Sequence, residues 1–460
     1  MKTIEISFLG VNYNMFKEII RKLYSSKRYL LEILEDDEKE IFNSFLKETA
    51  TKEKYQESIN ILSEFMYRYY NKKVVILIDE YDVPIQDGYL NQYYNDIVGL
   101  IKGVFSSALK GNINLDFAVM TGVLRVSKES LFSDLNNLKI YSIMESSYNE
   151  AFGFTTKETK TMLEYYGLKL NDEVKKMYDG YNFGGLEIYN PWSIINYCDD
   201  KKLLAYWVNT SGNELVIDLI KNADKTKDNV LEKDNVKITI EKLLSGESVD
   251  FIYNDKITYL DFKDRNMKNN VLNLLFASGY LTIDSEGKDR FGNVKRTVKL
   301  PNEEVKIFLN NIILSILIDD KGIDEALINN FCNGTLDYEP HIMEECLNKI
   351  LPDMSFLDES ESFYHGYVLG PFSMMLNENY VVRSNRESGS GRFDVMIRAK
   401  DNSVGVVIEF KITADDMELS AKKALDQIEE KEYYEELLRN DVEIIHKYGI
   451  VFKGKKCIVR

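Results

Sequence analysis

The sequence predicts an α/β fold in three parts: an N-terminal parallel sheet, a helical middle region and a C-terminal mixed sheet. The uninterrupted aliphatic run Val74–Ile78 is typical of a strand buried on both faces of a parallel sheet. The stretch 214–337 is mainly helical in its pattern. Two short apolar strands near the end of the chain each carry acidic residues. The predicted domain limits are 1–149, 150–337 and 338–460.

The first 121 residues alternate strands with helices, which is typical of a layered α/β domain. Residues 2–9 alternate with period two and predict a strand. The helical segments that follow end near Tyr70, and their last one has an apolar face that includes Leu62 and Met66. The remaining predicted elements here are a strand at 73–80, a helix at about 90–110 and a strand at 115–121.

The rest of the chain predicts short helices with aromatic, glycine-rich loops at 150–213 and then the helical stretch. A hairpin is predicted around Ser285–Gly287, between strands at 280–283 and 294–300. The C-terminal part predicts a helix at 361–376, a polar loop at 384–390, the two acidic strands, a helix at 421–440 and a last strand at 449–452.

Composition excludes several classes of protein. Net charge is −17, from 58 basic and 75 acidic residues, which argues against a general nucleic-acid coat protein but allows a local basic groove. No apolar run has the length of a membrane span, and the first residues lack a signal-peptide core. Four scattered cysteines and three histidines make a structural zinc site improbable. We therefore expect reduced thiols in a cytoplasmic protein.

Acidic residues end the buried strand of the N-terminal sheet. Asp79 and Glu80 follow Ile78, as in a Walker B strand, where the first acid holds Mg²⁺ and a neighbouring Glu activates water. Thr121 ends a later strand, and Thr121 and Arg125 are placed to contact a γ-phosphate. The phosphate-binding loop GxxxxGK[ST] does not occur in the sequence, so ATP is a doubtful cofactor and ATP turnover is not expected. The alternative is a solvated strand terminus.

The most informative residues are Asp394, Glu409 and Lys411, on the two C-terminal strands. Side chains alternate along a strand, so Glu409 and Lys411 point to the same face. If the strands pair through a loop at 400–403, two carboxylates and an ammonium meet, which suits Mg²⁺ or Mn²⁺. Plain surface charge is the alternative. Glu361, on the preceding predicted helix, is a candidate third metal ligand or a favourable helix N-terminal charge.

Three further residues are candidate substrate contacts. Gln427 is a plausible phosphate or base contact, with a helix surface position as the alternative, and Tyr433 follows it. Arg392 belongs to a set of basic residues that would form a phosphate-facing rim, and scattered surface charge explains that set nearly as well.

Two sets of motifs resemble known families. The N-terminal motifs resemble AAA-ATPase-like proteins found widely in bacteria, and the C-terminal motifs resemble the PD-(D/E)XK nuclease domain that these proteins carry. The first set comprises 78–85, 121–127, 135–137, 152–155, 178–181, 190–193 and 206–210. The second set comprises 363–366, 391–394, 408–411, Gln427–Ile428 and Tyr433.

The resemblance implies a restriction-endonuclease-like mixed sheet at 338–460, with Asp394 and Glu409 as metal-holding acids and Lys411 as the motif lysine. Family members usually carry a P-loop ahead of the strand that begins at Thr3, so the N-terminal part is expected to be a remnant of a P-loop sheet, through truncation or loss. The expected partner is nucleic acid, DNA first, with no membrane, and a homo-oligomer is allowed.

Three hypotheses follow from these patterns. The first is a Mg²⁺- or Mn²⁺-dependent nuclease. The second is a catalytically weak module that binds nucleic acid or protein. The third is an ATP-binding protein whose P-loop comes from another chain.

Overall fold

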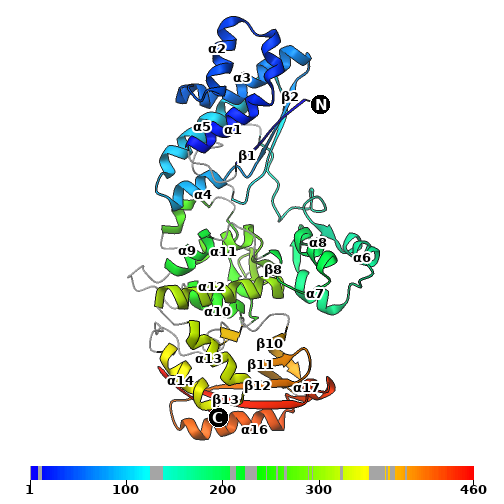
Figure 1. The fold of residues 1–460 in the computed structure, drawn as a ribbon, viewed down its shortest axis with the longest axis vertical. Coiled ribbons are helices and arrows are strands. Elements are labelled where there is room, and N and C mark those ends of the chain that lie inside the picture. The colour runs from blue at the N-terminus through cyan, green and yellow to red at the C-terminus, as the bar shows by residue number, and fades with distance from the viewer. Residues whose placement is uncertain are drawn as a thin grey trace. The chain divides into compact units, whose positions relative to one another are not determined.

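The computed structural model describes residues 2–8, 13–124, 138–207, 214–222, 236–244, 246–254, 257–263, 267–288, 290–292, 294–321, 325–351, 368, 371–372, 379–388 and 391–460. The chain forms two compact units, each built from two separate stretches of sequence (Figure 1). Unit 1 comprises Met1–Ser142 and Ile252–Ser278, and unit 2 comprises Ile143–Phe251 and Gly279–Arg460.

The sheet of unit 1 confirms the predicted parallel strands. Its strands are β1 (Lys2–Ser7), β2 (Val74–Asp79) and β3 (Leu115–Met120), in the order β1-β2-β3. Both pairings are parallel, and β2 lies in the centre, with Ile76 beside Ile4 and Ala118. The aliphatic run of β2 is therefore the buried middle strand, as the sequence predicts.

Helices pack on this sheet and supply an aromatic core. The side chains of Phe8, Phe16 and Phe105 are fully buried, and Phe16 contacts the ring of Tyr55. The longest helix begins where the Thr51 side chain accepts a hydrogen bond from the N–H of Lys54. The helices of unit 1 are α1 (Tyr13–Ser25), η1 (Arg28–Ile33), α2 (Asp36–Leu46), α3 (Lys52–Tyr70), α4 (Val83–Leu90), α5 (Tyr94–Leu109), η4 (Tyr259–Lys263) and α11 (Met267–Ala277).

Unit 2 begins with a small layered region that has its own core. The strands form a sheet of order β4-β6-β5. Its core includes Leu163, Tyr178, Tyr189 and Ile194. The elements are β4 (Phe154–Thr155), α6 (Thr156–Tyr165), α7 (Asp172–Tyr178), β5 (Tyr181–Phe183), β6 (Leu186–Tyr189) and α8 (Pro191–Asp200).

A buried carboxylate joins this region to a later helix of unit 2. Glu304, in the first turn of α12 (Glu303–Lys321), is fully buried. It accepts hydrogen bonds from the Ser193 hydroxyl at 2.7 Å and the Trp207 N–H at 2.8 Å. Beside it, the Asn302 side chain donates to the carbonyl of Asp179 at 2.8 Å. These bonds satisfy a carboxylate that would otherwise be costly to bury, and they connect three of the motifs quoted above.

The middle of unit 2 contains helices and a small sheet of order β7-β9-β8. The predicted hairpin is confirmed, since β8 pairs antiparallel with β9, but its turn is not at Ser285–Gly287: β8 continues through these residues, and Gly287 pairs with Lys295. Strand β8 is longer than predicted because its pairing with β9, and not the turn propensity of its own residues, determines where it ends. The elements are α9 (Glu214–Asn222), α10 (Val236–Leu244), β7 (Val249–Phe251), β8 (Thr282–Lys288), β9 (Val294–Lys299), α12, α13 (Glu325–Leu336) and α14 (Pro340–Ile350).

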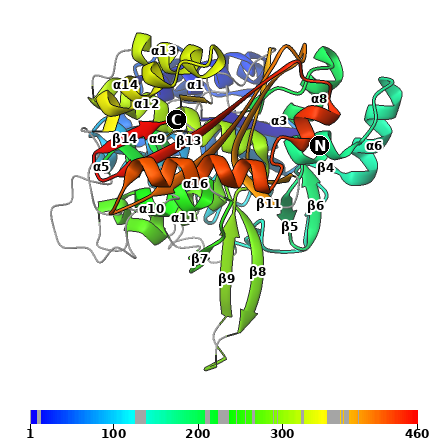
Figure 2. The same ribbon diagram turned by 90° about the horizontal axis from the view of Figure 1, so that it is seen from below.

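The C-terminal part of unit 2 is a mixed sheet of order β10-β11-β12-β13-β14. Its only parallel pair within the described residues is β12 with β13. One face packs on α13 and α14, and the other carries α16 (Figure 2). The elements are β10 (Tyr380–Ser388), β11 (Gly391–Ala399), β12 (Val404–Ile412), α16 (Met417–Glu430), α17 (Glu435–Arg439), β13 (Ile444–Lys453) and β14 (Lys456–Val459).

Two predictions in this part are wrong, and the predicted strand at 449–452 is confirmed within a longer strand. The predicted polar loop at 384–390 is largely strand β10, because pairing with β11 outweighs its polar composition. The predicted helix at 421–440 is two helices, α16 and α17, and between them Glu432 has a φ of 52°. The last strand begins at Ile444 and is followed by β14. The predicted helix at 361–376 falls mainly outside the described residues.

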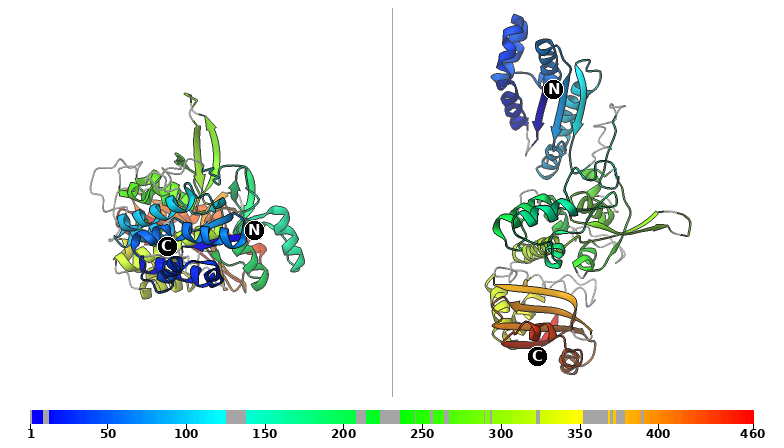
Figure 3. Two further views of the ribbon diagram at one scale, coloured as in Figure 1. Left: turned by 90° about the horizontal axis from the view of Figure 1, so that it is seen from above. Right: turned by 90° about the vertical axis from the view of Figure 1, so that its right-hand side faces the viewer.

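The C-terminal sheet and its helices are drawn from another side in the right panel of Figure 3. Among the described residues, no helix is long and apolar enough to cross a membrane.

Gly180 should be far more sensitive to substitution than Gly185. Both have positive φ, 98° and 90°, but a Cβ on Gly180 would lie 2.0 Å from the Pro301 carbonyl oxygen, whereas nothing lies within 4 Å of one on Gly185. Gly185→Ala should cost about 1–2 kcal/mol for the left-handed backbone. We expect Gly180→Ala to lower the urea unfolding midpoint clearly more. Equal midpoints would contradict the close packing of this loop on the start of α12.

Candidate functional site

Strands β11 and β12 place Asp394, Glu409 and Lys411 on one side of the C-terminal sheet. The pairs Val395–Ile408 and Ile397–Val406 define an antiparallel register, and Asp394 and Glu409 are the residues next to its last pair, Val395–Ile408. Ile408 and Phe410 belong to the core under α13 and α14, so Glu409 and Lys411, which alternate with them, face α16. The connecting loop is Lys400–Ser403, as predicted. The structure therefore brings these three predicted residues to adjoining positions.

Short hydrogen bonds hold the three side chains. The N–H of Phe410 donates to Asp394 Oδ2 at 2.7 Å, which ties the first carboxylate to the second strand. Lys411 Nζ donates to Glu409 Oε1 at 2.8 Å. Glu409 is 3% exposed, so its charge depends on nearby donors rather than on solvent. The side chain of Lys411 is 27% exposed and connects this buried carboxylate to the surface.

Helix α16 and the segment after it complete the cluster. Gln427 Nε2 donates to Glu409 Oε1 at 2.5 Å and to the Tyr433 hydroxyl at 2.9 Å. Burial raises the pKa of Tyr433 above its usual value, and the carboxylates of Glu409 and Asp394 add to this shift. Tyr433 is 3% exposed and packs in the core under α16, so it positions Gln427 rather than offering a surface contact.

The donor set fits a hard divalent cation. The described residues contain no group of three or more His, Cys, Asp or Glu side chains that could hold a metal ion. Two carboxylates are nevertheless a suitable protein contribution for Mg²⁺, which usually keeps several waters and takes further oxygens from a phosphate. Of the other predicted residues, Glu361 lies outside the described residues, as does the side chain of Arg392.

A second acidic cluster lies at the carboxyl ends of β2 and β3 in unit 1. The Thr121 hydroxyl donates to Asp79 Oδ1, and the N–H of Glu80 donates to the same oxygen at 3.1 Å. Burial, followed by the charge of Asp79, raises the pKa of Glu80. Asp79, Glu80 and Thr121 therefore lie together, as predicted, whereas Arg125 lies outside the described residues.

Asp82, which was not among the predicted site residues, organises the loop after β3. Asp82 is 2% exposed, and its carboxylate accepts N–H groups from Val123 at 3.1 Å and Leu124 at 2.7 Å. Burial raises the pKa of the nearby Tyr259, and the charge of Asp82 adds to this shift. A Cβ on Gly122 would lie 2.6 Å from Asp82 Oδ1, so glycine permits this close approach. The sequence signal for this role was an acidic residue three positions after Asp79, the last residue of β2.

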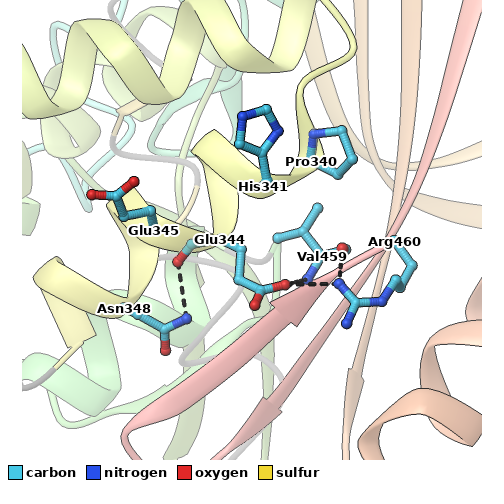
Figure 4. A pocket seen from close by; sticks show the side chains of 7 residues that line it. All are labelled: Pro340, His341, Glu344, Glu345, Asn348, Val459 and Arg460. Atoms are coloured by element: carbon cyan, nitrogen blue, oxygen red, sulfur yellow. Dashed lines mark hydrogen bonds and ion pairs between the residues drawn. The ribbon is translucent and has the colours of Figure 1, made fainter.

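A cavity of about 310 Å³ lies elsewhere in the C-terminal domain (Figure 4). None of the acidic clusters described above lines it. Its polar groups bind one another: Glu344 Oε2 accepts from the Val459 N–H at 3.0 Å and from Arg460 at 2.8 Å. The candidate site is therefore identified by the side chains that lie together on β11 and β12, and not by the presence of a cavity. The lining residues are Pro340, His341, Glu344, Glu345, Asn348, Val459 and Arg460.

Comparisons with known proteins find family matches for the N-terminal and C-terminal regions of the chain. Residues 2–132 match the family model described as "Predicted AAA-ATPase", and residues 359–460 match the PD-(D/E)XK nuclease superfamily. The chain thus has an AAA-ATPase-like N-terminal region and a C-terminal domain of the PD-(D/E)XK nuclease superfamily. It is also 27% identical over 395 residues to an "Uncharacterized protein in vnfD 5'region" of Azotobacter chroococcum mcd 1. The aligned residues cover 83% of this chain and 69% of that protein. No solved structure matches the chain significantly.

The contribution of Asp82 to the stability of unit 1 should fall as pH rises from about 4 to 6. Burial raises the pKa of Asp82 to about 6, despite the opposing N–H donors. An acid whose pKa is raised by folding stabilises the protein below its ordinary pKa, and that stabilisation is lost as pH rises through 6. A shift of about 2 units corresponds to about 3 kcal/mol. Urea unfolding of unit 1 should show this slope, and Asp82→Asn should flatten it.

The matched control for this measurement is Asp116→Asn, at an exposed aspartate of β3. That variant should keep the wild-type slope. A slope that is unchanged in Asp82→Asn would contradict the assignment to Asp82.

Removing one hydroxyl should separate the positioning role of Tyr433 from its packing role. Tyr433→Phe keeps the ring in the core but removes the acceptor for Gln427. We expect the unfolding free energy to change by about 1 kcal/mol or less. Metal affinity or cleavage should fall by about tenfold or more, as for other residues that orient ligands. Tyr434→Phe, which keeps the ring under Lys447, is the control and should retain both. Full metal affinity and cleavage in Tyr433→Phe would count against the positioning role.

Proposed function

We propose that the C-terminal domain hydrolyses phosphodiester bonds of nucleic acid, with Mg²⁺ or Mn²⁺ as cofactor and DNA as the first substrate to test. The observation that carries this proposal is the cluster of Asp394, Glu409 and Lys411 on one side of paired strands. Its position within the region that matches the PD-(D/E)XK nuclease superfamily supports it.

Each side chain has a proposed role that follows from its surroundings. Asp394 and Glu409 would hold the cation, because both are carboxylates on adjoining strands. Lys411 is partly exposed, so its ammonium can leave Glu409 and donate a hydrogen bond to a phosphate oxygen or to the attacking water. Gln427 donates to Glu409 and would keep that carboxylate oriented when the lysine moves.

When bound, the cation would lower the pKa of a coordinated water and offset negative charge on the phosphate. The acidic net charge of −17 does not oppose this chemistry, because an ion between substrate and protein reduces the repulsion of phosphates. Binding of nucleic acid without cleavage in any divalent metal would favour the regulatory alternative instead.

Cleavage of DNA or RNA by the purified protein should require Mn²⁺ or Mg²⁺ and should stop with EDTA. Lys411→Ala should reduce the rate by about a hundredfold or more, because it removes a cationic donor from the reacting phosphate. Asp394→Ala and Glu409→Ala should abolish cleavage by removing the ligands. Single- and double-stranded substrates of both kinds should be assayed in parallel.

Lys447→Ala is the matched control, since Lys447 lies on the neighbouring strand β13 and pairs with Glu429 at 2.7 Å, away from the cluster. It should cleave at the wild-type rate. Full cleavage by both Lys411→Ala and Asp394→Ala would refute the assignment.

A further inference from the structure

Helix α16 runs antiparallel to the strands β12 and β13 against which it packs. Ahead of the helix, Lys453 Nζ, at the end of β13, donates to the carbonyl of Asp415 at 2.9 Å. In the last turn of the helix, Glu429 accepts from Lys447 Nζ, nearer the start of β13, at 2.7 Å. Because β12 and β13 are parallel, the carboxyl end of β12 lies under the first turns of α16.

Side-chain contacts distinguish the two flanks of this helix. Gln427 donates to Glu409 of β12, so its flank faces the candidate site. Glu429 contacts β13, and Glu418 accepts from Arg460 Nε at 2.9 Å, next to β14, so their flank faces β13 and β14. The side chains between the two flanks are buried against the sheet, and they are Ala421, Ala424 and Ile428.

Two consecutive lysines of α16 fall on different flanks. An α-helix turns by about 100° per residue, so Lys423 is about 40° from Gln427, on the flank that faces the candidate site. By the same geometry Lys422 is about 20° from Glu429, on the flank that faces β13. Both lysine side chains are exposed, and neither forms an ion pair within the described part of the chain. The two residues therefore differ mainly in the surface that they face.

Lys423 also lies in a defined direction from the candidate site. It precedes Gln427 by about one turn, which is about 6 Å along the helix. Because helix and strand run in opposite directions, this displacement leads from Glu409 towards Lys411, which is about 7 Å further along β12. Lys411 and Lys423 are therefore displaced from Glu409 in the same direction, one on the strand and one on the helix.

The acidic side chains of α16 leave the charge of this flank in place. Of the four acidic residues of the helix, Glu418 and Glu429 are paired with basic residues on the other flank. Asp426 and Glu430 each lie two residues from the buried Ile428, so they are about 160° around the helix from it, on the exposed face. Neither of them forms an ion pair among the residues that the structure describes. The flank beside the candidate site can therefore attract an anion.

We propose that Lys423 binds a backbone phosphate of the nucleic-acid strand, next to the phosphate that Asp394 and Glu409 would hold through the cation. The proposal rests on the proposed function, because it takes the same polyanionic substrate. A strand that passes Glu409 in the direction of Lys411 reaches Lys423 next, and the flexible side chain of a lysine suits a point contact with phosphate.

This role is one of binding and not of catalysis. Contacts with phosphates fix the register and orientation of a nucleic acid on a protein and carry no sequence information directly. Lys423 would therefore hold the substrate in position beside the cluster and contribute to affinity for any sequence. The reacting phosphate would still be contacted by Lys411 and the cation.

The salt dependence of binding tests the contact in the 460-residue protein. A fluorescently labelled DNA duplex and its single strand would be titrated in EDTA, which prevents metal-dependent cleavage, and anisotropy would give Kd over a series of NaCl concentrations. One phosphate contact contributes about 0.9 to the slope of log affinity against log salt for a duplex and about 0.7 for a single strand. Lys423→Ala should lower the slope by this amount, which corresponds to about eightfold weaker binding at about 0.1 M salt relative to about 1 M.

The neighbouring lysine supplies the matched control. Lys422→Ala removes the same charge one residue away and should keep the wild-type slope, and Lys423→Arg, which retains the charge, should keep most of the affinity. Lys423→Ala should also bind Mn²⁺ as the wild-type protein does, which shows that the cluster is intact. Equal losses of slope in Lys422→Ala and Lys423→Ala would overturn the proposal, because they would indicate general attraction to an exposed cation.

Cleavage kinetics separate this inference from the proposed function. Lys423→Ala should raise KM with little change in kcat, whereas Lys411→Ala should lower kcat. Cleavage with an unchanged KM and salt slope in Lys423→Ala would overturn the phosphate contact and leave the proposed hydrolysis in place. A slope that depends on Lys423, without cleavage in any divalent metal, would keep the contact and refute the hydrolysis. Absence of any binding to DNA or RNA by the wild-type protein would overturn both.

Discussion

The antiparallel register of β11 and β12 is the constraint on which the candidate site depends. It sets Asp394 beside the end of the second strand, where the Phe410 N–H fixes its carboxylate at 2.7 Å. The alternation of β12 then sends Glu409 and Lys411 towards α16 and sends Phe410 into the opposite core. A shift of one residue would exchange these faces and bury the lysine among aliphatic side chains. The apolar packing on both faces of β12 therefore determines where the polar chemistry lies.

Burying Glu409 carries a cost that its neighbours offset. A carboxylate at 3% exposure is strongly destabilising unless donors surround it, and Lys411 and Gln427 both donate to its Oε1. Tyr433 then holds Gln427 through its hydroxyl. Glu304 and Asp82 are also buried carboxylates that hydrogen-bond donors stabilise. Each accepts a backbone N–H group from a segment distant in sequence.

The sequence was sufficient to predict features that depend on local periodicity. The buried strand before Asp79 follows from its uninterrupted aliphatic run, and the common face of Glu409 and Lys411 follows from alternation. Long-range contacts were not predictable. Strand β10 is polar but is held by its partner β11, and Asp82 binds N–H groups 41 and 42 residues away. The return of 252–278 to unit 1, where Tyr259 contacts Asp82, is likewise absent from any local pattern.

The central claim is that carboxylates from two adjoining strands share one divalent cation, and Mn²⁺ binding tests it most directly. Titration followed by electron paramagnetic resonance should show one tight site in the wild-type protein. Asp394→Asn and Glu409→Gln, which preserve shape but remove charge, should each lose that site, whereas Asp79→Asn should keep it. Retention of the site in both Asp394→Asn and Glu409→Gln, with intact folding, would contradict the account.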